Sequence, residues 1–296
     1  AVEKTNRRDR GEYRGYTVRR EYGCVSFFIN SCKTQPDEDF YLAFGLSNKK
    51  ENRMLFQRKS LQVSYGEAIG ILLLDSPVPF IPGDVANATS FNFPVRYKKV
   101  AGFSVQKALD ADESVYPFLL SAAQELKENG VLAITGNCGF MALHQNRLKK
   151  DLNMPIFLSS LLQIPFIKQI IPEDQKIGII SASKRNLSES FLEKIGINGI
   201  KGLVVAGLEN CPEFKTAVLD EKGSLDSTLM KAEVLETASN MLMENQDIGA
   251  ILLECSLLPP YAEAVADKMG LPVFDYMTMI DFVFSGVVKK SYQGYM

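Results

Sequence analysis

Two of the five cysteines, Cys138 and Cys255, stand at matching places in the amino-acid sequence. Each ends an apolar run typical of a strand, VLAITGNC or GAILLEC, and each precedes by 17 residues the proline of a second apolar segment, MPIF or LPVF. On opposite sides of one cleft, a thiolate could remove a proton from one face of a carbon while a thiol returns it to the other. The pair therefore predicts acid–base chemistry at a carbon centre.

A free cysteine is more often a small buried apolar side chain than a reactive group. That interpretation is kept for Cys24, Cys32 and Cys211, whereas the repeat favours chemistry for the matched pair. The spacings contain no CxxC pair, and the chain is too long for a disulfide framework. We therefore expect free thiols in a reducing, cytoplasmic compartment.

The acidity of the two thiols limits this hypothesis. Lowering a thiol pKa from about 8.5 by two units needs about 2.7 kcal/mol, whereas a helix N-terminus supplies about 0.3–1 kcal/mol. Backbone amides and the exclusion of water have to supply the remainder. Glu254, beside Cys255, opposes ionisation if its carboxylate points toward the thiol, although strand alternation would turn it away.

The elements that position these thiols are expected to be parallel strands covered by helices. A continuous apolar run, IGILLLD, predicts a strand at 69–75 that is buried on both faces. Apolar residues at intervals of three and four predict a helix over 115–126. Further strands are expected at 131–135, 155–158, 177–181, 203–206, 250–254 and 272–275. Strand–helix alternation of this length indicates an α/β fold with parallel sheets.

An internal repeat predicts two pseudosymmetric flavodoxin-like lobes, because IGILLLDS at 69–76 is answered by IGIISASK at 177–184. The expected domains are a β-rich N-terminal extension, 1–65, lobe 1, 66–170 with a C-terminal return at 278–296, and lobe 2, 171–277. The extension is basic and carries β-prone runs at 16–18, 24–29 and 41–45. An anion-binding face is one interpretation of it, and a solvated arm or an oligomer contact is the favoured one.

Composition excludes several classes of function. Lys and Arg number 33 against 35 Asp and Glu, so no excess of positive charge is available to hold nucleic acid. The longest apolar runs have strand length, far short of the ~20 residues of a membrane span. A single histidine, His144, excludes a histidine-cluster metal site, and we interpret it as a surface or packing residue. No glycine-rich nucleotide motif is present, so we expect neither metal nor cofactor.

Four segments, spread over residues 66–296, resemble the aspartate/glutamate racemase superfamily, the cofactor-independent racemases with paired cysteines. They are PGDVANATSFNFPV (82–95), ITGNCGF (134–140), MPIFLSS (154–160) and LECSLLPPY (253–261). The resemblance implies that Cys138 and Cys255 are the two acid–base thiols. It also implies a small carboxylate or amino-acid substrate, held by backbone amides and small polar side chains near the cysteines. These residues would be Asn137, Gly139, Ser183 and Ser256. A homo-oligomer, dimer or tetramer, is expected.

The motifs depart from those of the glutamate racemases, since CGF, ECS and DSP stand where CNT-like, GCT-like and DSG motifs are usual. The combination of TGNCGF with LECSLLPPY is more similar to a branch that includes algal dimethylsulfoniopropionate lyases. Inversion and elimination both begin with removal of an α-proton, so the sequence leaves both open. Racemisation or epimerisation of a small, aspartate-like amino acid is the first hypothesis, elimination of a β-substituent is the second, and a non-catalytic sensor or scaffold is the third.

The segment at 82–97 follows the first strand and is rich in polar and aromatic residues, so we expect a substrate lid there. Asp84, Asn87 and Thr89 are candidate substrate contacts, with turn formation as the equal alternative. Arg96 is the nearest cation that could bind a second carboxylate, and a surface role for it is the stronger alternative.

Overall fold

The computed structural model describes residues 2–5, 13–20, 23–30, 55–59, 61–198 and 201–296. The chain forms two compact units, Ala1–Gln57 and Arg58–Met296. The first unit contains a three-stranded antiparallel sheet in the order β1-β2-β3. Its strands are β1 (Val2–Thr5), β2 (Tyr13–Arg20) and β3 (Gly23–Asn30). The expected β-rich character of the N-terminal segment is therefore confirmed, and the run at 41–45 lies outside the described residues.

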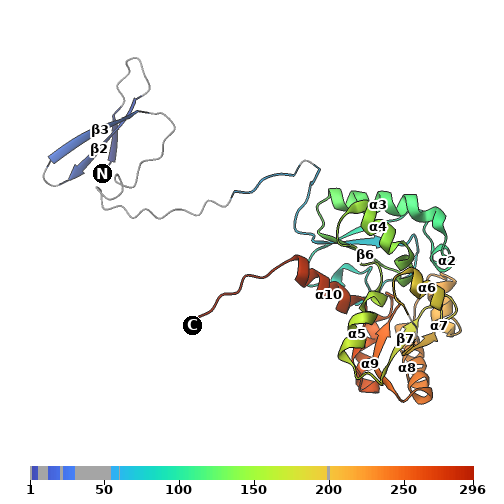
Figure 1. Ribbon diagram of the computed structural model, residues 1–296. Helices are drawn as coiled ribbons and strands as arrows, with labels where there is room; N and C mark the ends of the chain where they lie inside the picture. Colours follow the sequence, from blue (N-terminus) through green and yellow to red (C-terminus); the bar gives the residue numbers. More distant parts are fainter. Residues whose placement is uncertain (1, 6–12, 21–22, 31–54, 60, 199–200) are drawn as a thin grey trace. The chain divides into compact units, whose positions relative to one another are not determined.

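Two separate parallel sheets form the framework of the second unit (Figure 1). The first sheet has the order β5-β4-β6, with both outer strands parallel to β4. Its strands are β4 (Ile69–Leu73), β5 (Val95–Lys99) and β6 (Ala133–Gly136). The helices that accompany it are α2 (Val105–Leu109), α3 (Tyr116–Glu128) and α4 (Gln145–Leu152).

The second sheet has the order β10-β9-β7-β8 and is also parallel throughout. Its strands are β7 (Lys176–Ser181), β8 (Leu203–Gly207), β9 (Ile248–Leu253) and β10 (Val273–Phe274). Its helices are α5 (Ile164–Ile170), α6 (Glu189–Lys194), α7 (Pro212–Phe214), α8 (Ser227–Glu244) and α9 (Ala262–Met269). The α/β class with parallel sheets is therefore confirmed.

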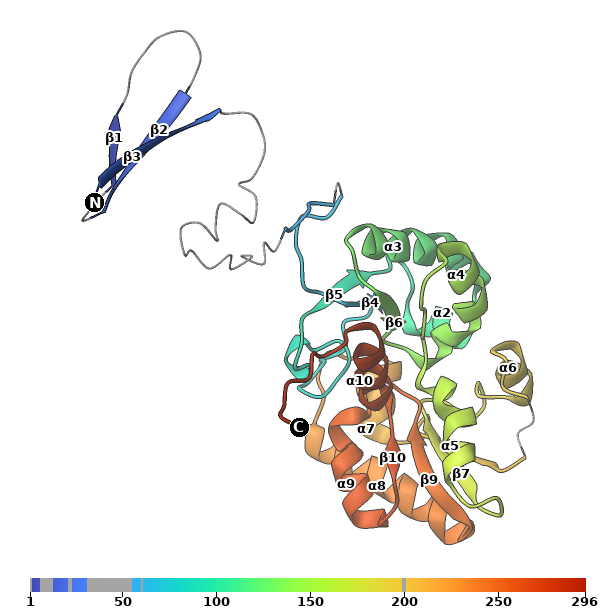
Figure 2. The same ribbon diagram turned by 60° about the vertical axis from the view of Figure 1, so that its left-hand side comes forward.

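Strand β4 is covered on both faces, as its continuous apolar run predicts. Leu72 belongs to the main core with α3, whereas Ile69 and Ile71 point to the other face, where α10 (Tyr276–Val287) packs. Figure 2 shows α3 and α10 on either side of this sheet. Phe284 of α10 stacks on Phe93, with ring centroids 3.6 Å apart. Helix α10 thus covers the second face of the first sheet.

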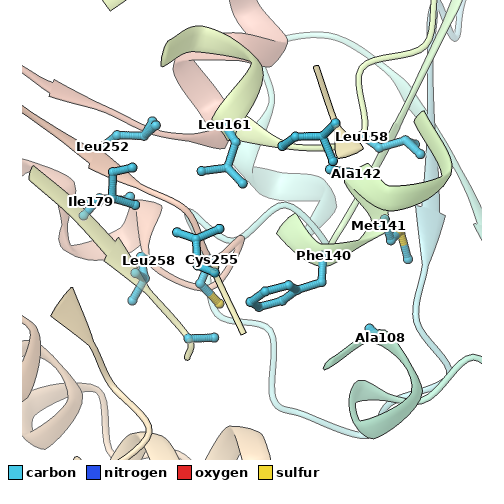
Figure 3. Packing of buried hydrophobic residues seen from close by; sticks show 14 of the residues in the cluster. Ala108, Phe140, Met141, Ala142, Leu158, Leu161, Ile179, Leu252, Cys255 and Leu258 are labelled. Carbon is cyan, nitrogen blue, oxygen red and sulfur yellow. The ribbon is translucent and has the colours of Figure 1, made fainter. Parts of the chain in front are cut away.

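The main hydrophobic core is continuous between the two sheets. It contains Leu72 from the first sheet. Figure 3 shows Leu158 from the first sheet's side near Ile179, Leu252 and Cys255 from the second. A shared core fixes the two sheets relative to each other, because an opening motion would expose this apolar surface to water. Within the described residues, no helix combines the length and apolar character that a membrane crossing requires.

Two details differ from the sequence-based expectation. The segment expected to be a strand at 155–158 contributes only a single parallel bridge, between Ile156 and Ile134. Strand β5 begins within the last three residues of the segment that was expected to be a lid and continues to Lys99. It is an edge strand with the sequence VRYKK, and its half-exposed, charged residues lack the apolar run that marks a buried strand.

Candidate active site

Cys138 lies just beyond the carboxyl end of β6, at the residue that precedes the 3₁₀ helix Gly139–His144. It is partly exposed. Burial raises the pKa of its thiol to about 12, the charge of Glu254 adds to the rise, and the backbone amides of Phe140 and Met141 oppose it. The amides of this helical turn therefore offset only part of the effect of burial, which favours the neutral thiol.

Cys255 occupies the equivalent place beyond β9, and 7% of its surface is exposed. Burial raises the pKa of its thiol well above the ordinary value. The charges of Glu254, Cys138 and Asp84 raise it further, and the backbone amide of Leu257 opposes them. Because ionisation of one cysteine affects the other, the two thiols lie within electrostatic range of each other.

The carboxyl group of Glu254 is buried at this junction, with 1% of the residue exposed. Its Oε2 accepts hydrogen bonds from Ser181 Oγ at 2.9 Å and from the Ala182 amide at 3.3 Å. Its Oε1 has no hydrogen-bond partner among the described residues. Burial raises the pKa of Glu254 to about 7, and the two hydrogen bonds limit the rise. The group therefore exchanges a proton near neutral pH.

Glu254 connects the two cysteines. It precedes Cys255 in the chain, yet a Cβ atom at Gly139, the residue after Cys138, would overlap its Oε1. Gly139 is thus the residue that allows the carboxyl group to lie against the Cys138 turn. Of the two alternatives left open by the sequence, the structure supports the one in which the carboxylate faces the thiols, because Oε1 lies against Gly139 and its charge raises the pKa of both cysteines.

The loops that carry the cysteines are tied together by buried hydrogen bonds. Ser256 Oγ donates to the carbonyl oxygen of Asn137 at 2.5 Å, and the Leu74 amide donates to Asn137 Oδ1 at 2.8 Å. Ser160 Oγ donates to the carbonyl oxygen of Leu253, at the end of β9, at 3.0 Å. The sequence-predicted residues Asn137 and Ser256 therefore lie beside the cysteines. Their hydrogen bonds connect the loop after β6 to the loop after β9.

Ser183, another sequence-predicted contact, follows β7 and takes part in a second connection between the lobes. Its Oγ donates to Asn186 Oδ1 at 2.6 Å, and Asn186 Nδ2 donates to the carbonyl oxygen of Leu109 at 2.7 Å. Leu109 ends α2, which accompanies the first sheet. The hydroxyl of Ser183 therefore orients a residue that bridges the lobes.

A cavity of about 140 Å³ lies beside this bridge, and Leu109, Phe140, Asn186 and Lys194 contribute to its lining. Figure 3 shows the ring of Phe140 directed toward the side chain of Cys255. The same ring packs edge-on against Phe191 of α6, with centroids 5.4 Å apart. Phe140 therefore lies between the cavity, which it lines, and the side chain of Cys255, toward which its ring points.

Asp84 lies in the loop after β4 and is buried, with 1% exposed. Its Oδ1 accepts a hydrogen bond from the Ala86 amide at 2.6 Å, and within the described residues its Oδ2 has no partner. Burial raises the pKa of Asp84 to about 7, against the effect of the Ala86 amide. Its charge in turn raises the pKa values of Cys255, Tyr97 and Tyr261, and the hydroxyl of Tyr97 donates to the carbonyl oxygen of the next residue, Val85, at 3.0 Å.

The loop of Asp84 meets the second lobe at the 3₁₀ helix Pro259–Tyr261. Gly83 has a φ of +98°, and a Cβ atom there would lie 3.0 Å from the Cα atom of Pro260. Both the backbone conformation and the close approach require glycine at this position. The contact places Asp84 over the loop that follows Cys255.

The other loop candidates have local roles. Asn87 caps the 3₁₀ helix Ala88–Ser90, since its Oδ1 accepts from the Thr89 amide at 3.0 Å and from Thr89 Oγ1 at 2.6 Å. Its Nδ2 donates to the carbonyl oxygen of Phe80 at 3.0 Å. Thr89 is exposed. For these two residues the structure provides the turn-forming contacts of the alternative interpretation.

Arg96 lies far from the strand ends that carry the cysteines. It sits on β5 opposite Gly70, near the start of β4, and forms an ion pair with Glu67 at 3.0 Å. It also donates to Asn129 Oδ1, at 3.4 Å. Parallel strands place their amino ends at one edge and their carboxyl ends at the other. The structure therefore does not bring Arg96 to Cys138.

His144 is a packing residue, as one of its two sequence-based interpretations stated. It is 3% exposed and lies between Phe103 and Tyr116, with ring centroids 6.0 and 5.8 Å away. Burial lowers its pKa, which favours the neutral ring. In the part of the chain that the structure describes, no three His, Cys, Asp or Glu side chains are grouped as metal ligands would be.

No family model matches the chain. It is 30% identical over 230 residues to a dimethylsulfoniopropionate lyase of Durusdinium sp. clade D, a match that covers 75% of this chain and 76% of the relative. The chain belongs to the dimethylsulfoniopropionate lyase family. It is also 30% identical over 238 residues to dimethylsulfoniopropionate lyase 6 of Emiliania huxleyi (strain CCMP1516), where the match covers 78% of this chain and 62% of the relative.

The fold of this family member is similar to solved structures of the aspartate/glutamate racemase superfamily. A point mutant of arylmalonate decarboxylase matches with a TM-score of 0.51 and 15% identity, covering 77% of this chain and 97% of that chain. Allantoin racemase from Klebsiella pneumoniae matches with a TM-score of 0.50 and 15% identity, covering 76% and 96%. The resemblance to the dimethylsulfoniopropionate lyases is confirmed by the sequence relatives, and the solved structures show that the fold is shared with a decarboxylase and a racemase.

Sequence reasoning missed two buried groups at the site of this family member. Glu254 was noted only for its effect on the neighbouring thiol, although the ECS motif and the glycine after Cys138 together signal its buried position. Tyr276, at the start of α10, is fully buried and donates to the carbonyl oxygen of Leu158 at 2.8 Å. Burial raises its pKa well above the usual value, and the charges of both cysteines and Glu254 add to this. A tyrosine at the start of a late helix gives no local sign of this placement.

Proposed function

We propose that the chain is a lyase that removes the α-proton of a β-substituted carboxylate and expels the β-substituent, with dimethylsulfoniopropionate as the substrate. The observation that carries the proposal is the pair of thiols, Cys138 partly exposed and Cys255 buried, whose pKa values are raised by the charge of the buried Glu254, in a chain of the dimethylsulfoniopropionate lyase family. Cys138 or Cys255 is the base, and Asn137, Gly139, Ser183 and Ser256 form the surroundings that hold the substrate carboxylate.

The reaction needs one base. A thiolate takes the proton from Cα, the electron pair of that C–H bond forms the Cα=Cβ double bond, and the Cβ–S bond breaks. The electron pair of the Cβ–S bond leaves with sulfur, so the products are acrylate and neutral dimethyl sulfide, and the proton stays on the thiol until it passes to water. Because the leaving group takes no proton, the second thiol is not required as an acid.

The electrostatics of the site favour a cationic substrate. With a pKa of about 12, only about one Cys138 in ten thousand is ionised near pH 8. The charges that act on the thiols come from Glu254, Asp84 and the thiols themselves, and all of them oppose ionisation. A sulfonium group within about 4–6 Å of a thiol would lower its pKa by about 1–3 units. Binding of the substrate would thereby help to create the base.

The same electrostatics disfavour aspartate, which carries a second carboxylate. Such a substrate needs a cation in the site, and Arg96, the candidate from the sequence, lies at the other edge of the first sheet and is paired with Glu67. Racemisation of a small amino acid is the second candidate function. The mutual influence of Cys138 and Cys255 supports it, because inversion needs an acid and a base on opposite faces of one carbon.

The experiment is to incubate the protein with dimethylsulfoniopropionate in deuterated buffer and to measure dimethyl sulfide by gas chromatography and acrylate by NMR. The two products are expected in equal amounts. Aspartate is incubated in parallel, and α-deuteration with inversion there would indicate racemisation. Release of neither product, with inversion of aspartate, would refute the lyase proposal.

Single variants of the two cysteines test which thiol removes the α-proton. Cys138→Ser or Cys255→Ser, whichever removes the abstracting base, should abolish elimination, while the other replacement only slows turnover. Cys211→Ser is the matched control, because this free thiol precedes α7 and contacts Thr237 Oγ1 at 3.7 Å. Full activity in both single variants would remove cysteine chemistry from the mechanism.

A further inference from the structure

We propose that Asp84 is the counter-ion for an onium group on the β-carbon of the substrate, so that the site selects zwitterions with a β-cation and a carboxylate. This inference rests on the proposed function and adds the residue that recognises the leaving group. It extends the substrate class to sulfonium and quaternary ammonium carboxylates, whether or not they react.

The first support is an oxygen atom without a partner. Asp84 is 1% exposed, its Oδ1 is used by the Ala86 amide, and among the described residues nothing donates to its Oδ2. Buried polar atoms of native proteins are satisfied in the great majority of cases, and each exception calls for an explanation. A cation bound against Oδ2 would satisfy this carboxylate without a hydrogen-bond donor.

The second support is what surrounds this carboxylate. Tyr97 of β5 donates its hydroxyl to the carbonyl oxygen of Val85, the residue after Asp84, at 3.0 Å. Tyr261 follows Pro260, which packs against Gly83, the residue before Asp84. The loop of Asp84 is therefore in contact with two tyrosine-bearing segments, and the charge of Asp84 also raises the pKa of Cys255. Aromatic rings attract onium cations through the negative faces of their π systems. A methylated sulfonium or ammonium group has no N–H to donate, so a carboxylate together with aromatic rings suits it.

The third support is the pair of loops that carry these groups. Asp84 comes from the loop after β4 in the first lobe, and Cys255 follows β9 in the second, where Gly83 packs against Pro260. A substrate with its β-onium group at Asp84 therefore has its α-carbon on the side of the thiols. The carboxylate attracts the group that leaves, and the thiol removes the proton from the adjacent carbon.

Two ligands of equal shape test the inference without turnover. They are 3-(trimethylammonio)propionate and 4,4-dimethylpentanoate, which differ only in the charged nitrogen that replaces a carbon. Titration calorimetry should give at least about 30-fold tighter binding of the onium ligand to the wild-type chain. Equal affinities in the wild type, or no binding of the onium ligand at millimolar concentration, would overturn the inference.

The variant Asp84→Asn should reduce this preference to less than about threefold, while the affinity for 4,4-dimethylpentanoate stays unchanged. Asparagine keeps an oxygen that accepts from the Ala86 amide, so the loop retains its internal contact. Asp267→Asn is the matched control, because it removes the same charge from an exposed position of α9. A preference that persists in Asp84→Asn would assign the cation to another group.

The pH dependence gives an independent measurement. Asp84 has a pKa of about 7, so the wild-type affinity for the onium ligand should fall about tenfold for each pH unit below that value. Tyr97, Tyr261 and Cys255 face Asp84 with raised pKa values and stay neutral there. Glu254 titrates in the same range and is retained in Asp84→Asn, so the dependence that remains in the variant is that of Glu254, and the difference between the two profiles measures Asp84.

The outcome is separable from that of the proposed function. Release of dimethyl sulfide by a protein that binds both ligands equally would refute the role of Asp84 and leave the lyase standing. Discrimination between the ligands without release of dimethyl sulfide would support the onium site and refute the lyase.

Discussion

Replacing Glu254 by glutamine should make the Cys138 thiol markedly more acidic. Glutamine keeps an oxygen that accepts from Ser181 Oγ and the Ala182 amide, but it removes the negative charge that opposes ionisation of the thiol. Two unit charges roughly 6 Å apart, in an effective dielectric constant of about 20, interact with about 2.8 kcal/mol. That energy corresponds to a fall of about two pH units in the pKa of Cys138.

The sign of this effect follows from the order of the two titrations. Glu254 loses its proton near pH 7 and the Cys138 thiol near pH 12, so Glu254 is ionised throughout the titration of the thiol. Its full charge therefore acts on the thiolate, and glutamine removes all of that effect. Below about pH 6 the carboxyl group is neutral, so wild type and variant should react alike.

The measurement is the rate of alkylation of Cys138 by iodoacetamide against pH, followed by mass spectrometry of the peptide that contains it. Glu263→Gln serves as the control, because Glu263 is exposed on α9 and the substitution changes the net charge equally. The variant's profile should shift by about two units to lower pH, and the control's should not move. An unchanged or higher pKa of Cys138 in Glu254→Gln would refute the electrostatic argument.

Three further predictions concern stability. Gly139→Ala should lower the free energy of unfolding by more than about 2 kcal/mol, measured by urea denaturation, because its Cβ would overlap the carboxyl group of Glu254; Gly286→Ala, with open space around it, should be neutral or stabilising. Ser256→Ala should destabilise the chain by about 1–3 kcal/mol in the same assay, since it leaves a buried carbonyl oxygen unpaired, and a loss below about 0.5 kcal/mol would contradict this. Because folding raises the pKa values of Glu254 and Asp84 to about 7, the folded protein loses stability as the pH rises from about 4 to 7. The melting temperature of the double variant Glu254→Gln/Asp84→Asn should fall less over that interval than that of the wild type. Parallel plots of melting temperature against pH would refute the raised pKa values of the two groups.

The buried carboxyl groups of Glu254 and Asp84 give the site a negative electrostatic potential when they are ionised, and a bound cation would neutralise it. Glu254 and Asp84 each retain one oxygen without a partner in the part of the chain that the structure describes. A neutral or anionic ligand leaves these groups with their protons, whereas an onium ligand favours their ionised forms and that of the thiol. Substrate binding and activation of the base are therefore linked in the proposed mechanism.

The amino-acid sequence by itself determined the architecture and the positions of the two thiols. Strand–helix alternation, the apolar run of β4 and the cysteine that follows β6 or β9 are local properties, since burial on both faces of a strand needs a continuous apolar segment. The sequence pattern did not predict the elements at the edge of the first sheet correctly. Strand β5 is half exposed and charged, so it lacks the pattern of a fully buried strand. The segment expected to be a strand at 155–158 is apolar and buried at 156–158, yet it forms one bridge only, a difference that its apolar pattern does not reveal.

Only the tertiary structure decided which polar groups share the site. Glu254 lies against Gly139, 115 residues earlier in the chain, and Asp84 acts on Cys255 from the other lobe. Arg96, although close to Asp84 in sequence, lies at the amino end of β5, because residues 85–94 take the chain from the carboxyl end of β4 back to the opposite edge of the sheet before β5 begins. The burial of a side chain and the charges that act on it depend on which strand ends meet. The order of the strands in each sheet and the shared core of the two lobes determine which ends meet, and the residue pattern along a single segment contains no information about this.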